Sequence, residues 1–331
     1  MSVPAPPRRL SLLLGLLVVG GLLCAPSALA QVGNEQKVTE GVGGFAGSLA
    51  AEDAFGRSVA PLGDLDGDGT GTTEVAVGAF RDEVNGKAEA GSVWIVSLET
   101  DGTVSDQVQI TENSGGFGGT LAAGDQFGVS VAAPGDVNGD GVEDLAVGAR
   151  YDSEAGENRG AVWILLLNAD GTVDGEIKID DGDAGLQLSN GDKFGQEVAS
   201  GDVDGDGATE LLVGATGTND GEGAVWILSF DDTGSVASAS RIDGDSPGIA
   251  LENSDDFGFS IASLGPLSSA GKPAVAVGAF RDDDGNTNAG ALWIVTLNAD
   301  GTVAGAQKIS AAAGGFSGAL ALEDRFGSAA A

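Results

Sequence analysis

Three features that recur together predict an all-β fold, a β-propeller of four-stranded blades. The dipeptide Phe-Gly recurs, an apolar segment with a central tryptophan follows it, and in three cases an acidic, glycine-rich loop stands between the two. The phenylalanines are Phe55, Phe127, Phe194, Phe257 and Phe326, and the tryptophans are Trp94, Trp163, Trp226 and Trp293. Such a period is typical of a supersecondary unit stacked on copies of itself. A β-solenoid is the alternative, although its repeats are usually much shorter.

Each full repeat predicts four strands. The first runs from Phe-Gly into the acidic loop, as in residues 127–136, and the second is a segment such as LAVGA at 145–149. The third, AVWILLL at 161–167, is apolar at consecutive positions, as in a strand that is buried on both faces. Asp-Gly turns such as 170–171 connect it to the fourth strand by hairpin chemistry. No segment after residue 30 shows a helical pattern.

The chain is expected to begin with a secretory signal peptide at 1–30. Arg8 and Arg9 precede a short apolar run, and an A-x-A-like cleavage site ends at Ala30. The run is too short for a transmembrane helix, so no membrane insertion is expected after cleavage, and the protein should be secreted or at the cell surface.

The repeats divide the rest of the chain. The expected parts are a partial repeat, the outer strand of a blade, at 31–54; repeats 1 to 4 at 55–126, 127–193, 194–256 and 257–325; and the start of a truncated fifth repeat at 326–331. Because the strands that would complete a further blade are missing after Gly327, we expect four full repeats in an incomplete or truncated ring.

Composition narrows the possible chemistry. The sequence has 50 Asp and Glu against 15 Lys and Arg, no histidine, and a single cysteine, Cys24. After signal cleavage no Ser-His-Asp triad, Cys-His pair or His-ligated metal site can be built. The acidic surface disfavours nucleic acid as a partner. A glycosidase-like carboxylate pair is compatible with composition alone, and the acidity also fits a saline habitat.

The motifs resemble FG-GAP repeats, which form the blades of the integrin α-subunit propeller and of many exported bacterial proteins. The resemblance covers essentially Val38 to Gly327 and is carried by Phe-Gly, by GDVNGDGVEDLAVGA at 135–149, and by the Gly-Ala before the tryptophan strand. It implies a calcium ion in the loop between the first and second strands of a blade. The larger propellers of the family have seven blades, whereas this chain has four full units.

The acidic loops themselves favour a hard cation. Oxygen side chains at alternate residues, with glycine allowing a sharp turn, suit an ion that takes six to eight oxygen ligands. We therefore expect three Ca²⁺ sites. The expected ligands are Asp64, Asp66, Asp68, the Thr70 carbonyl and Glu74 in the first loop; Asp136, Asn138, Asp140, the Val142 carbonyl and Asp144 in the second; and Asp202, Asp204, Asp206, the Ala208 carbonyl and Glu210 in the third.

Two alternatives apply to these loops. They are not EF-hands, because the twelfth position from Asp136 or Asp202 is a valine and not a glutamate. They could instead be Asx-turn loops on an acidic surface that bind nothing. In the first loop a two-residue insertion moves the closing acid, which is the last predicted ligand of each loop, to Glu74. The fourth repeat has Pro266, Lys272 and no acid at the equivalent place, so no ion is expected there.

The opposite end of the blades carries pairs of aromatic and arginine residues. The pairs Phe80-Arg81, Arg150-Tyr151 and Phe280-Arg281 each follow a second strand. They could anchor an interface, since aromatic and arginine side chains dominate binding surfaces. We favour packing between blades, with the next aspartate in a turn. The tryptophans, with their apolar flanks, are expected in the core.

Two functions remain open. The first is a calcium-stabilised propeller that binds an extracellular protein or glycan, as the resemblance to adhesion modules implies. The second is a non-catalytic propeller within a larger exported enzyme, carbohydrate- or phosphoester-active, whose catalytic domain is not in this chain. No catalytic constellation is recognisable, because nearly every clustered acid is assigned to a loop. Neither an enzymatic activity nor a nucleic-acid partner is expected.

Overall fold

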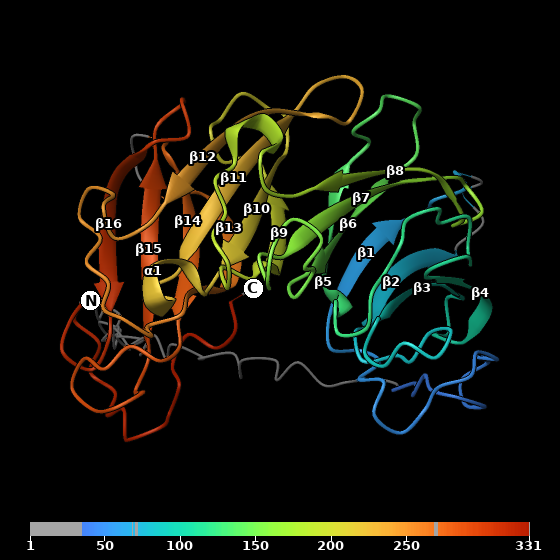
Figure 1. Cartoon of the computed structure of the whole chain (residues 1–331), viewed down its shortest axis with the longest axis horizontal. Helices are drawn as coiled ribbons and strands as arrows, with labels where there is room; N and C mark the ends of the chain where they lie inside the picture. The colour runs from blue at the N-terminus through green and yellow to red at the C-terminus, as the bar shows by residue number, and fades with distance from the viewer. Residues whose placement is uncertain (1–34, 68, 70–71, 268–270, 331) are drawn as a thin grey trace, which may run out of the picture. The chain divides into compact units, whose positions relative to one another are not determined.

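The computed structural model describes residues 35–67, 69, 72–267 and 271–330, so the expected signal peptide lies outside the described residues. The chain divides into residues 1–35 and residues 36–331, and every named strand belongs to the second part. This part consists of four antiparallel sheets of four strands, each with its strands in chain order (Figure 1). The predicted fold class is confirmed.

The strands of the four sheets have the following bounds. The first sheet has β1 (Val59–Gly63), β2 (Thr73–Ala79), β3 (Ser92–Leu98) and β4 (Val104–Ile110); the second has β5 (Phe127–Gly135), β6 (Asp144–Ala149), β7 (Ala161–Leu167) and β8 (Val173–Ile179). The third has β9 (Phe194–Gly201), β10 (Glu210–Ala215), β11 (Ala224–Phe230) and β12 (Val236–Ile242); the fourth has β13 (Phe257–Pro266), β14 (Pro273–Ala279), β15 (Ala291–Leu297) and β16 (Val303–Ile309).

The sheets contact one another in chain order through their first strands: β1 contacts β5, β5 contacts β9, and β9 contacts β13. Because neighbours cover both faces, all six residues of β6 are buried, and so are six of the seven in β7. Outer strands such as β8 are mostly half-buried. In the described part of the chain the series of sheets does not close into a ring, as expected for an incomplete propeller.

One backbone contact between neighbouring sheets explains both recurring motifs. Gly148, in the Val-Gly-Ala segment of β6, lies against Gly195, the glycine of the next Phe-Gly. A Cβ atom on Gly148 would lie 2.1 Å from the carbonyl oxygen of Gly195, whose φ is +86°. The pair Gly214 and Gly258 has the same geometry between the third and fourth sheets. Only glycine permits this approach, so the two motifs are two halves of one contact.

The segment before each of the first two sheets covers the tryptophan of that sheet. Phe45 packs edge-on against Trp94, and Phe117 against Trp163, with ring centroids 5.0 Å apart in both pairs. Both phenylalanines are buried. All four tryptophans are also buried, which confirms their expected place in the core.

Three details differ from the simplest expectation. The first sheet starts at Val59, not at Phe55, and the backbone N–H of Gly56 bonds to the Gly78 carbonyl outside the regular ladder. Residues 36–54 contain one isolated bridge, between Thr39 and Val42, and no named strand. Two single-turn helices occur in loops, η1 (Asp183–Gly185) and α1 (Thr218–Gly221), and both include residues with positive φ.

The alternation of strand direction places the β1–β2 and β3–β4 loops at one end of a sheet and the β2–β3 loop at the other. We call the end with the acidic loops the acidic end and the other the Phe-Gly end. Among the described residues, no helix has the length and apolar character needed to cross a bilayer.

Candidate metal centre

The acid that closes each acidic loop occupies the same ladder position in three sheets. Glu74 pairs with Gly63, Asp144 with Gly135, and Glu210 with Gly201. In the fourth sheet the equivalent partner of Gly265 is Ala274. The two-residue insertion in the first loop is therefore absorbed before Glu74, and the strand register is preserved.

These three acids make the same hydrogen bond. The backbone N–H of Leu65 donates to Glu74 Oε2, that of Val137 to Asp144 Oδ2, and that of Val203 to Glu210 Oε2, each at 2.9 Å. All three acids are buried. Each carboxylate stands at the start of the second strand, and the N–H group of a loop residue holds it beneath the loop.

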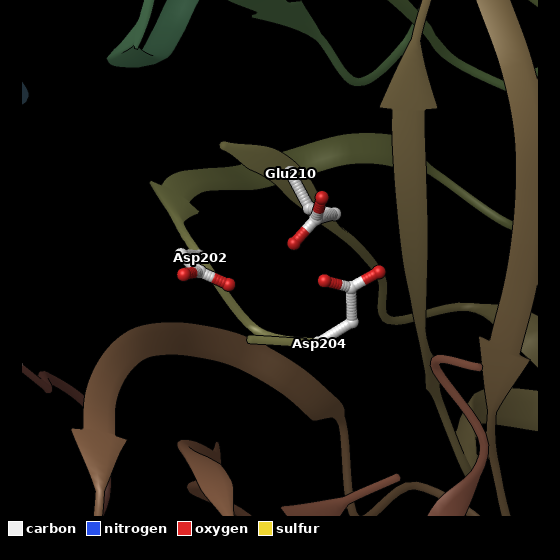
Figure 2. A group of neighbouring side chains, drawn as sticks. All are labelled: Asp202, Asp204 and Glu210. Atoms are coloured by element: carbon white, nitrogen blue, oxygen red, sulfur yellow. The ribbon is translucent and has the colours of Figure 1, made fainter. Parts of the chain in front are cut away.

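In the third loop the structure brings three carboxylates together. Ligand oxygens of Asp202, Asp204 and Glu210 all lie within 4.8 Å of one another. Figure 2 shows the two loop aspartates and the strand glutamate directed toward a common space. Ligands at 2.3–2.6 Å from one Ca²⁺ ion are separated by up to about 5 Å, so this spacing fits a single hard cation.

The turn that presents these oxygens is built by Asp202. Its carboxylate accepts the backbone N–H groups of Gly205 at 2.6 Å and of Gly207 at 3.1 Å. Asp206, also a predicted ligand, is exposed and outside the three-carboxylate group; its Oδ1 accepts the N–H of Ala208. The third loop therefore unites three of its four predicted side-chain ligands.

The electrostatics of the third loop also favour a cation. Burial, together with repulsion from Asp204, Asp206 and Asp202, raises the pKa of Glu210 from 4.5 to about 7. The side-chain carboxylates oppose one another's ionisation, and a bound divalent ion would remove that conflict.

The second loop has the same turn with one substitution. The carboxylate of Asp136 accepts the N–H groups of Gly139 and Gly141, both at 2.7 Å. At the place of Asp204 stands Asn138, whose amide donates to Asp140 Oδ2 at 2.9 Å. Burial raises the pKa of Asp144 to about 6, and repulsion from Asp140 and Asp136 adds to the effect. The loop thus carries three predicted carboxylates and the Asn138 oxygen, which accepts the N–H of Asp140 at 3.0 Å. Among the described residues only the third loop gathers three carboxylates.

In the first loop the structure describes only part of the predicted set. Asp64 Oδ2 accepts the N–H of Gly69 at 2.9 Å, as Asp136 and Asp202 do in their loops. Asp68 and Thr70 lie outside the described residues. In the fourth sheet, Lys272 donates to Asn298 Oδ1 at 2.8 Å, so an ammonium group stands near the place of the acidic loop.

Comparison with known proteins identifies the repeats that carry these loops. The FG-GAP repeat model matches residues 127–165 and 194–228, which span the second and third acidic loops and their tryptophan strands. This chain contains FG-GAP repeats.

Integrin α subunits are similar to this chain over much of its length. Integrin alpha-4 of Xenopus laevis is 32% identical over 219 residues, which are 63% of this chain and 20% of the integrin. Integrin alpha-V of Gallus gallus is 32% identical over 251 residues, 71% of this chain and 21% of the integrin. The chain thus spans about a fifth of these integrin subunits. The biofilm matrix protein Bap1 of V. cholerae aligns with a TM-score of 0.32 and 15% identity, over 76% of this chain and 38% of Bap1.

Proposed function

We propose that this chain is an exported, calcium-binding β-propeller module that binds a protein or a glycan outside the cell and catalyses no reaction. The observation that carries the proposal is the convergence of Asp202, Asp204 and Glu210 within 4.8 Å in a loop of an FG-GAP repeat. The repeated register of Glu74 and Asp144 supports equivalent sites in the first two sheets.

In this proposal the ion has a structural role. Ca²⁺ would be held by the predicted oxygens of each loop and would compensate carboxylates that now repel one another. It would fix the hairpin between the first and second strands of three sheets. Extracellular modules commonly bind Ca²⁺ with Kd values of about 10⁻⁴–10⁻³ M, which suits a site outside a cell.

The binding role rests on the likeness to integrin α subunits and on the repeat architecture. It is tested by presenting the chain without residues 1–30 to a glycan array and to immobilised extracellular proteins, with Ca²⁺ and with EDTA. We expect calcium-dependent capture of a specific ligand. Failure to capture any ligand in either condition, by a chain shown to be folded, would contradict the proposed role.

A further inference from the structure

Three arginines gather at the Phe-Gly end of the first two sheets. Arg81 follows β2 and Arg150 follows β6. Arg57 precedes β1 and stands between Gly56 and Ser58, which both hydrogen-bond to the backbone of Gly78 near the end of β2. The guanidinium groups of Arg81 and Arg150 lie 5.4 and 5.6 Å from the centroid of the Phe80 ring, and that of Arg150 also lies 4.8 Å from the Tyr151 ring. We call Arg57, Arg81 and Arg150 the arginine cluster.

The cluster has no internal counter-charge at ion-pair distance. Within the described residues, none of its three guanidinium groups forms an ion pair with a carboxylate, whereas seven other cationic side chains do. Burial lowers the pKa of Arg150, and the charges of Arg57 and Arg81 lower it further. In a chain with a formal charge of −35, three adjoining unpaired arginines are unexpected.

Two acids act electrostatically on the cluster without pairing with it. Glu89 Oε2 accepts the side-chain amide of Gln126 at 2.7 Å. Burial raises the pKa of Glu197 to about 7, which reduces its charge near neutral pH. Glu89 attracts Arg150, and Glu197 attracts Arg57, but neither pair lies at ion-pair distance.

A buried donor beside the cluster also lacks a partner. Gln196 is 3% exposed, and its Oε1 accepts Nη1 of Arg150 at 2.9 Å. Its Nε2 has no hydrogen-bond partner among the described residues. A buried amide donor without a partner costs about 1–3 kcal/mol. Gln126 Oε1 fixes Arg150 from the other side, accepting its Nε at 2.7 Å.

We propose that the arginine cluster, with Gln196 beside it, is a binding site for a carboxylate side chain of an acidic segment of a partner protein. Guanidinium groups bind carboxylates through paired N–H donors, and Arg150 is already oriented by two rings and two amides. The proposal rests on the binding role inferred above and names its site and the partner's chemistry.

The aromatic rings favour a protein partner over an acidic glycan. Sugars bind by stacking on open aromatic faces, but arginines already lie over the rings of Phe80 and Tyr151. Phe80 is also buried. What the site offers is charge and hydrogen-bond donors in a compact group, which matches one or two carboxylates of a peptide.

The test uses the chain from residue 31 with saturating Ca²⁺, and fluorescence anisotropy of a labelled oligo-glutamate peptide. The double variant Arg57→Gln/Arg81→Gln removes two exposed charges and should weaken binding about tenfold. Lys37→Gln/Lys272→Gln is the control, since it removes two charges away from the cluster and should leave the affinity unchanged. Arg150→Lys keeps the charge but loses the fork, and should also weaken binding. Melting temperatures check that each variant folds.

The outcomes distinguish a failure of the arginine-cluster site from a failure of the proposed binding role. An oligo-glutamate affinity that Arg57→Gln/Arg81→Gln leaves intact, or that falls equally in the control, overturns the site. Tighter binding of an oligogalacturonate of matched charge, lost in the same variant, overturns the partner class. Absence of peptide binding by a chain that captures another ligand in the array overturns this inference and leaves the binding role intact. A chain that binds no ligand contradicts both.

Discussion

The effect of the Glu210 carboxylate on the free energy of unfolding should change sign when calcium binds. Without the ion, Glu210→Gln should raise the free energy of unfolding by about 1 kcal/mol in mildly alkaline buffer, because a buried, crowded carboxylate becomes neutral. The glutamine oxygen can still accept the N–H of Val203. With excess Ca²⁺ the variant should be the less stable protein. Urea unfolding in both buffers measures the reversal.

Asp232→Asn supplies the control for that comparison, since it removes an exposed charge near the same loop. It should behave alike with and without calcium. A Glu210→Gln protein that gains as much from Ca²⁺ as the parent would show that Glu210 is not a ligand.

Asp255 should make stability fall as pH rises. It is 3% exposed, and burial raises its pKa from 3.8 to about 7. Between these values the folded chain keeps a proton that the unfolded chain has released, so raising the pH favours unfolding. Asp255→Asn should flatten this slope and stabilise the chain by about 1–3 kcal/mol above pH 7. Urea unfolding in EDTA across this interval measures it.

The equivalent residue Asp324 accepts a backbone N–H in the same way, from Ala321, but is exposed. Asp324→Asn, which removes a carboxylate of the same local geometry from an exposed position, is therefore the matched control. An unaltered slope in Asp255→Asn would remove Asp255 as the cause.

Among strands, the glycine contact between sheets is the most sensitive point. Gly148→Ala places a methyl group 2.1 Å from the backbone oxygen of Gly195, which has no flexible end to move. We expect a loss of about 3 kcal/mol or more in unfolding free energy. Gly175→Ala, in β8 of the same sheet, meets only Leu166 Cδ1 at 3.5 Å and should be neutral or slightly stabilising. Equal effects of the two substitutions on chemical denaturation would contradict this explanation of the motifs.

The segments between sheets offer a matched pair of phenylalanines. Phe117 is 2% exposed under Trp163, whereas Phe316, in the corresponding segment after the fourth sheet, is 37% exposed. Phe117→Ala should cost about 3–5 kcal/mol, and Phe316→Ala no more than about 1 kcal/mol. Similar losses in thermal unfolding would show that the packing on tryptophan is not what stabilises the sheets.

The sequence predicts those elements that depend on neighbouring residues better than those that depend on contacts between residues far apart in the chain. The second and third strands and the hairpin turns follow from local pattern, because burial on both faces produces an unbroken apolar run such as AVWILLL. The two-residue insertion in the first loop points to Glu74 as its closing acid, and the ladder pairing of Glu74 with Gly63 agrees with that register. Phe117 packs on Trp163 and Arg150 lies over the Phe80 ring, and both contacts join distant residues that no local pattern connects. At the Phe-Gly end Phe80 and Phe280 are both buried, and the ring of Phe280 lies 4.0 Å from that of Phe259 in the same sheet, so packing between blades stays a prediction for this residue.

The four sheets together repeat one contact, so each sheet depends on its neighbours for a buried face. Calcium in three acidic loops would therefore stabilise more than the hairpins that hold it. Stiffening the first and second strands also fixes the glycines through which adjacent sheets meet. Bound ions and the backbone contacts would then stabilise the same structure from its two ends.

Calcium stoichiometry, measured by isothermal titration calorimetry on the chain from residue 31, is the decisive measurement for the proposed metal sites. We expect three ions per chain, two in Glu210→Gln, and a melting temperature that falls when EDTA removes them. A chain that binds no calcium, or that melts at the same temperature with and without it, would contradict a structural role for the acidic loops.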